Sequence, residues 1–206
     1  GKDSHLLYDM IFLGAPGVMA LSILFGATSM LAVTITFERK SRSFERLLLS
    51  PIGLKLLMLA KTTGAIVFGI INALIPVFLA FFTTDLSGIN WFQTLGGVFL
   101  IAVTSTFLGL FISVSVSEVF EAQTFSNFFR FPMIFLCGLF VPVNSLPVIL
   151  QPLSYLIPLT YGVDILKSSI HGTGLFPTWI SFTVLIGFSL ALFLFSTGNI
   201  EKKWIY

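Results

Sequence analysis

The sequence has little charge and few side chains that can hold a metal or form a cross-link. Of its 206 residues, 10% are Asp, Glu, Lys or Arg, one is a cysteine, Cys137, and two are histidines, His5 and His171. One cysteine excludes an internal disulfide framework and a cysteine-based metal cluster, and two histidines are too few for a convincing metal site. A net charge of +2 is too small to indicate a nucleic-acid partner. We therefore expect no cofactor on this chain.

A nucleotide-binding loop is also absent. No GxxxxGK[ST] motif, whose backbone and lysine hold nucleotide phosphates, occurs anywhere in the sequence. The chain itself is therefore not expected to hydrolyse ATP.

Apolar residues dominate the composition of the chain. They make up 56% of the sequence, and the mean hydropathy of +1.00 leaves too little polar surface to cover a water-soluble globule. Because unsatisfied backbone groups are costly in lipid, every span is expected to be a helix of about 20 residues. We predict one all-α transmembrane domain over residues 1–206, with five spans at about 17–37, 63–82, 95–116, 125–141 and 177–197.

The distribution of Lys and Arg predicts the orientation. Nine basic residues fall in the loop 38–62, at the C-terminus and at Arg130 near the start of the fourth predicted span, and only Lys2 and Lys167 fall on the other side. The positive-inside rule puts the richer side in the cytoplasm. This orientation leaves the N-terminus outside, so we expect one more helix upstream and six spans in all. An intact five-span protein is the alternative.

The segment 142–171 is apolar but interrupted by prolines at 142, 147, 152 and 158, which prevent one continuous helix. We predict two short helices half buried on the outer face, between Asn144 and about Ser154 and from about Thr160 to Ser169. Asn144 or Ser145 is the predicted cap of the first.

The stretch ERKSRSFERLLLSP, residues 38–51, carries six of the twenty formal charges. Within it, Phe44, Leu47 and Leu48 form an apolar stripe at helical spacing, with charged residues opposite and Pro51 as a limit. The pattern predicts a short amphipathic helix. It is either an anchor on anionic lipid head groups or a docking helix for a soluble partner.

Three stretches resemble ABC type-2 exporter permeases in that family's order. The first is 38–51, with Lys40, Arg42 and Ser43 departing from the family's acidic residue, glycine and threonine. The second is FPMIFLCGLFVPVNSLPVILQPLSYLIPLTYGVD at 131–164, and the third is GAPGVMAL at 14–21. The residues that carry the resemblance to the outer segment are Pro142, Pro147, Pro158, Thr160, Tyr161 and Asp164.

The resemblance implies a permease of the plasma or inner membrane that pairs with a second copy or a homologue. It also implies a separate ATP-binding subunit, which carries ATP and Mg and contacts the permease through a cytoplasmic coupling helix. The coupling residues implied here are Glu38, Arg39, Arg42, Phe44, Glu45, Arg46, Leu47, Leu48, Ser50 and Pro51.

A transporter or channel that works without ATP is the rival interpretation. It predicts an ionisable residue near the middle of the bilayer that binds a coupling ion or proton. No Asp or Glu falls inside a predicted span.

Overall fold

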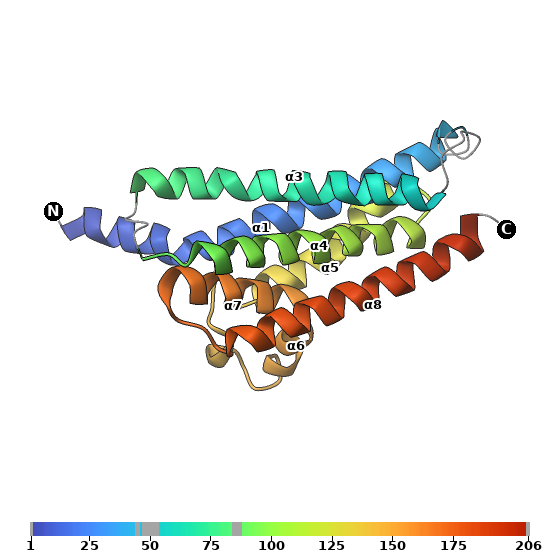
Figure 1. The fold of residues 1–206 in the computed structure, drawn as a ribbon. Helices are drawn as coiled ribbons and strands as arrows, with labels where there is room; N and C mark the ends of the chain where they lie inside the picture. Colours follow the sequence, from blue (N-terminus) through green and yellow to red (C-terminus); the bar gives the residue numbers. More distant parts are fainter. Residues whose placement is uncertain (1, 44–45, 47–53, 84–87, 205–206) are drawn as a thin grey trace.

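The computed structural model describes residues 2–43, 46, 54–83 and 88–204 as an elongated helical bundle, with no strand within these ranges (Figure 1). Its elements are α1 (Lys2–Lys40), α3 (Leu54–Thr83), α4 (Trp91–Ser115), α5 (Val119–Leu136), a 3₁₀ turn η1 (Val143–Ser145), α6 (Gln151–Leu156), α7 (Pro158–His171) and α8 (Thr178–Trp204).

Four of the five predicted spans are confirmed as helices long and apolar enough to cross a membrane. In the described residues these segments are Gly14–Lys40, Leu56–Phe78, Trp91–Ser115 and Thr178–Gly198. α1 and α4 lie at the centre of the bundle, while α3 and α8 leave many large apolar side chains exposed. Such surfaces suit a lipid environment.

The fourth predicted span, 125–141, is not among these segments. α5 begins at Val119 and ends at Leu136, because the chain turns at Gly138, whose φ of +80° suits a glycine. The helix also includes Glu121, Gln123 and Asn127, which lower its hydropathy. The count of five spans is therefore not confirmed.

The central helices α1 and α4 approach closely through small and hydroxyl-bearing residues. The Thr28 hydroxyl donates a hydrogen bond to the Ser105 carbonyl oxygen over 3.1 Å. A Cβ at Gly109 would lie 2.7 Å from the Thr28 carbonyl oxygen, so only glycine fits there. Such contacts are the usual means of helix association in lipid.

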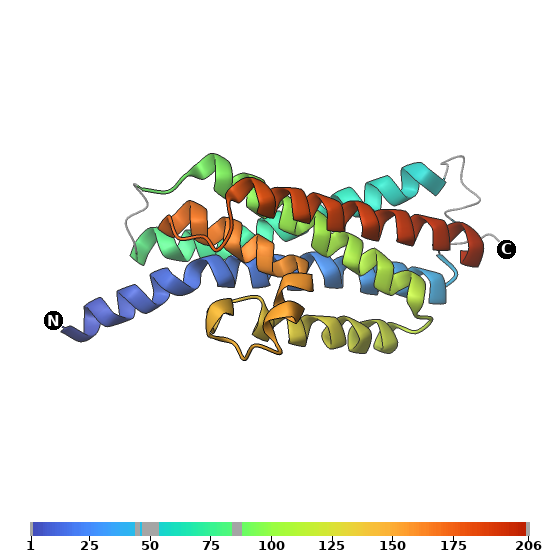
Figure 2. The ribbon, with the colours of Figure 1, turned by 90° about the horizontal axis from the view of Figure 1, so that it is seen from below.

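The two ends of the bundle differ in charge. One end holds the end of α1, the start of α3, the α4–α5 connection and the end of α8, and the N-terminus lies at the other (Figures 1 and 2). The end of α1, the loop after it, the start of α3 and the end of α8 together carry eight of the eleven Lys and Arg residues, so we call this the basic end. The structure thus brings these basic residues to one end, as the predicted orientation requires; which side of the membrane this end faces stays a prediction.

Arg130 does not belong to the basic end. The sequence assigns it there, but it occupies the second half of α5 and its side chain is only 1% exposed. The error follows from the predicted start of the span, because α5 begins six residues before 125.

The segment 142–171 is broken as the prolines predict, but at different points. The first predicted helix, from Asn144 to Ser154, is replaced by the 3₁₀ turn η1 and the six-residue α6. Pro142, rather than Asn144 or Ser145, stands at the N-cap of η1. The second predicted helix is confirmed as α7, with Pro158 in its first turn, where proline is tolerated.

Candidate functional site at the basic end

Only part of the predicted coupling stretch lies within the described residues. Glu38 and Arg39 occupy the last turn of α1, and Arg42 and Arg46 follow it. The predicted amphipathic helix therefore stays a prediction. The coupling residues outside the described ranges are Phe44, Glu45, Leu47, Leu48, Ser50 and Pro51.

At the end of α1, one departure from the family pattern falls on a position whose backbone favours glycine. Arg42 has a φ of +57°, in the left-handed region, and its amide donates to the Arg39 carbonyl oxygen over 3.2 Å. This is a helix C-terminal position where glycine is usual. The family that this stretch resembles has glycine at this position. An arginine in the left-handed conformation destabilises the fold by roughly 1–2 kcal/mol.

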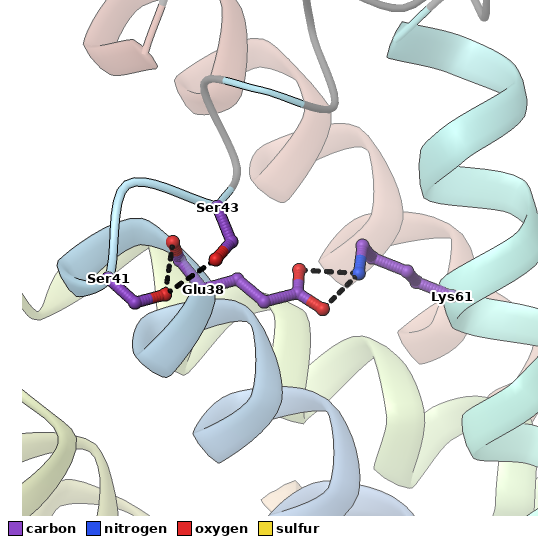
Figure 3. Close-up of polar contacts among 4 residues, drawn as sticks. All are labelled: Glu38, Ser41, Ser43 and Lys61. Carbon is purple, nitrogen blue, oxygen red and sulfur yellow. Dashed lines mark hydrogen bonds and ion pairs between the residues drawn. The ribbon is translucent and has the colours of Figure 1, made fainter.

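Glu38 and Lys61 form the central ion pair of the site (Figure 3). The Lys61 Nζ lies 2.6 and 2.5 Å from the two Glu38 carboxylate oxygens, and the Lys61 and Glu38 side chains are 14% and 20% exposed. The pair joins the last turn of α1 to α3. These two helices flank the loop that is predicted to contact the ATP-binding subunit. Because water is largely excluded, the pair is stronger than one on an open surface.

Two serines close the turn that follows α1. The Ser41 hydroxyl lies 3.2 Å from the Glu38 carbonyl oxygen and 3.0 Å from the Ser43 hydroxyl (Figure 3). Such local side-chain bonds favour turns over continued helix. They stabilise the turn at residues 41–43.

A second set of contacts joins α1 to the α4–α5 connection. Arg39 Nη1 donates to the carbonyl oxygens of Ser113 and Val116 over 3.0 and 3.2 Å. Lys40 pairs with Glu118, but their side chains are 55% and 45% exposed, so this pair contributes little. The end of α1 is thus tied to α3 on one side and to α4 and α5 on the other.

Glu118 and Glu121 cap the start of α5. The Glu121 carboxylate accepts hydrogen bonds from the amides of Ser117 and Glu118, over 3.1 and 3.2 Å, in a capping box. These bonds satisfy amides that the first turn of a helix leaves unpaired. The α4–α5 connection, which accepts a hydrogen bond from Arg39, is therefore stabilised by hydrogen bonds of its own.

The residues of the outer motif lie away from the basic end, and their contacts are internal. The Thr160 hydroxyl donates to the Ser154 carbonyl oxygen over 2.7 Å, and the Tyr161 hydroxyl to that of Tyr155 over 2.8 Å. These bonds fold α6 against α7. The structure does not bring the two predicted sets of residues together.

Asp164 holds the middle of α7 to the α7–α8 connection and to the start of α8. Its carboxylate accepts from the amides of Leu175 and Phe176 over 2.5 and 3.4 Å, and from the Ser181 hydroxyl over 2.9 Å. The side chain is 3% exposed, and three donors compensate for its burial.

Comparison with known proteins gives a family match and several relatives that cover most of the chain. The family model for the ABC-2 type transporter matches residues 4–171. The inner membrane transport permease YadH of Escherichia coli strain K12 is 23% identical over 200 residues, which cover 97% of this chain and 78% of YadH. The YadH proteins of Escherichia coli O157:H7 and Shigella flexneri match with the same identity and coverage.

Proposed function

Since the chain belongs to the ABC-2 type transporter family, we propose that it is the permease subunit of an ABC exporter that uses ATP hydrolysed by a separate subunit. The chain is a multi-pass protein of the cell membrane. A second copy or a homologue completes the permease. ATP and Mg are bound by the partner, since the chain has no phosphate loop.

The observation that carries this proposal is the network at the basic end. The predicted coupling loop leaves α1 directly after Glu38 and Arg39, which contact α3 and α4 respectively. A partner that pushes on the loop therefore acts on three helices at once. Charged groups around an apolar stripe also suit a docking surface, since charge fixes register while the stripe supplies burial.

The apolar segment 142–171 is proposed to line the outer half of the permease without crossing the membrane. Support comes from its short elements, since α6 has six residues and α7 has fourteen. At about 1.5 Å per residue, neither reaches across a hydrocarbon core of about 30 Å.

An ATP-independent transporter remains the rival. It needs a group that binds and releases a proton or a cation. The buried charged side chains among the described residues are Arg130 and Asp164. A guanidinium keeps its proton and repels cations, and the Asp164 carboxylate already accepts hydrogen bonds from three donors of the chain. Neither group is therefore well placed to supply that coupling.

Site-specific crosslinking tests the proposal. A photo-crosslinking amino acid at Arg46, which is exposed at the basic end, is expected to capture an ATP-binding-cassette subunit in native membranes. The same amino acid at Ser145, in the outer segment, is the matched control and should capture none. Capture from Ser145 but not from Arg46 would overturn the proposed coupling surface.

A further inference from the structure

Arg130 is a positive charge enclosed by the bundle. Its side chain is 1% exposed, and the other buried charged side chain among the described residues is Asp164. Asp164 accepts hydrogen bonds from three donors, whereas one nitrogen of the Arg130 guanidinium, Nε, has no hydrogen-bond partner.

The partners of Arg130 are neutral. Nη2 donates to the Ser29 hydroxyl over 2.7 Å and to the Phe25 carbonyl oxygen over 3.4 Å, while Nη1 lies 3.5 Å from Asn127 Oδ1. The Phe25 ring lies 4.8 Å from the guanidinium carbon. Nε has no partner, and none of the carboxylates in the described ranges pairs with the guanidinium.

The guanidinium lies about halfway across the predicted membrane. Its contacts Phe25 and Ser29 are near the middle of the candidate span Gly14–Lys40. A charge at this depth costs at least about 2.5–3.5 kcal/mol, and such residues usually mark a pathway or a ligand site. A residue with only a packing role would not need a charge here.

We propose that Arg130 binds the anionic group of the cargo, and that the cargo is an amphiphile carrying a phosphate or a carboxylate. This inference rests on the proposed transport function and names its substrate class. A guanidinium forms paired hydrogen bonds with both oxyanions. The free Nε and the long contact to Asn127 leave donors for such a group.

The surroundings explain why the ligand is an amphiphile rather than a free anion. Phe25 covers the guanidinium and is itself 38% exposed, so movement of one ring uncovers the charge. Along α1, the exposed Val18 and Phe25 share one helix face with Ser29, which accepts the hydrogen bond from the guanidinium. The two apolar side chains offer a surface for an acyl chain beside an anion-binding group.

The test compares two amphiphiles of equal chain length. The permease with its ATP-binding subunit is placed in phosphatidylcholine nanodiscs, and binding of dodecyl phosphate and dodecyl maltoside is measured without nucleotide. We expect dodecyl phosphate to bind at least tenfold more tightly. Arg130→Gln should abolish this preference. Arg130→Lys keeps the charge but cannot form the paired hydrogen bonds of a guanidinium, so it should retain part of the preference.

Lys167→Gln is the matched control, since it also removes one partly buried positive charge and should keep the preference. Equal binding of the two amphiphiles to the wild-type protein would overturn the inference even if Arg130→Gln does not fold. Loss of the preference in phosphatidylglycerol nanodiscs would assign the site to a bilayer lipid and overturn the cargo assignment. Because binding is read without nucleotide, a complex that hydrolyses ATP but shows no preference refutes this inference alone.

Discussion

Lys61→Glu is expected to uncouple the permease, lowering the permease-dependent part of ATP hydrolysis by about tenfold or more. The substitution places a second carboxylate against Glu38 where both side chains are largely shielded from water. Breaking a buried pair costs about 3–5 kcal/mol, and partial exposure reduces this to roughly 2–3 kcal/mol. Since about 1.4 kcal/mol is tenfold in an equilibrium constant, separation of the end of α1 from α3 should become more than tenfold more frequent.

The measurement is ATP hydrolysis by the reconstituted complex relative to the isolated ATP-binding subunit. The double variant Glu38→Lys/Lys61→Glu restores opposite charges and should recover most of the coupling. Lys40→Gln is the exposed control and should change stability by less than about 1 kcal/mol. Full coupling in the Lys61→Glu variant would contradict a mechanical role for this pair.

Asp164→Ala is expected to destabilise the outer part of the bundle by about 2–4 kcal/mol. It removes the acceptor shared by the amides of Leu175 and Phe176 and the hydroxyl of Ser181, and leaves these donors without a partner in the interior. The apparent melting temperature of the purified protein should fall by several degrees.

Two variants calibrate this loss. Asp164→Asn keeps one carbonyl oxygen as an acceptor, so its effect should be smaller. Thr183→Ala removes an exposed hydroxyl that bonds only within its own helix and should be nearly neutral. An unchanged melting temperature for Asp164→Ala would show that these hydrogen bonds do not hold α7 to α8.

The long helices were predictable because the sequence of each contains one continuous apolar run. α1, α3, α4 and α8 all contain a predicted span, since lipid leaves the backbone of such a run no alternative to a helix. α5 was placed six residues late, because its first half carries Glu121 and Gln123 and reads as a loop. Proline predicted that segment 142–171 breaks, but not where each piece begins.

The site was only partly predictable for a different reason. The charge of Glu38 and Arg39 is visible in the sequence, and the family resemblance assigned both to the coupling region. Their partners are not visible, because Lys61 is 23 residues from Glu38 and Ser113 is 74 from Arg39. Long-range pairs depend on how helices pack, which the helical pattern of each one does not specify. For the same reason Arg130 was assigned to the wrong depth.

The central claim is that the basic end faces the cytoplasm, where a soluble ATP-binding subunit can reach it. Single cysteines at Arg42 and at Ser145, in a Cys137→Ala background, test it by labelling intact cells with a membrane-impermeant maleimide; both positions are exposed. We expect Ser145→Cys to react in intact cells and Arg42→Cys only after the membrane is opened. Labelling of Arg42→Cys from outside, with Ser145→Cys protected, would contradict the account.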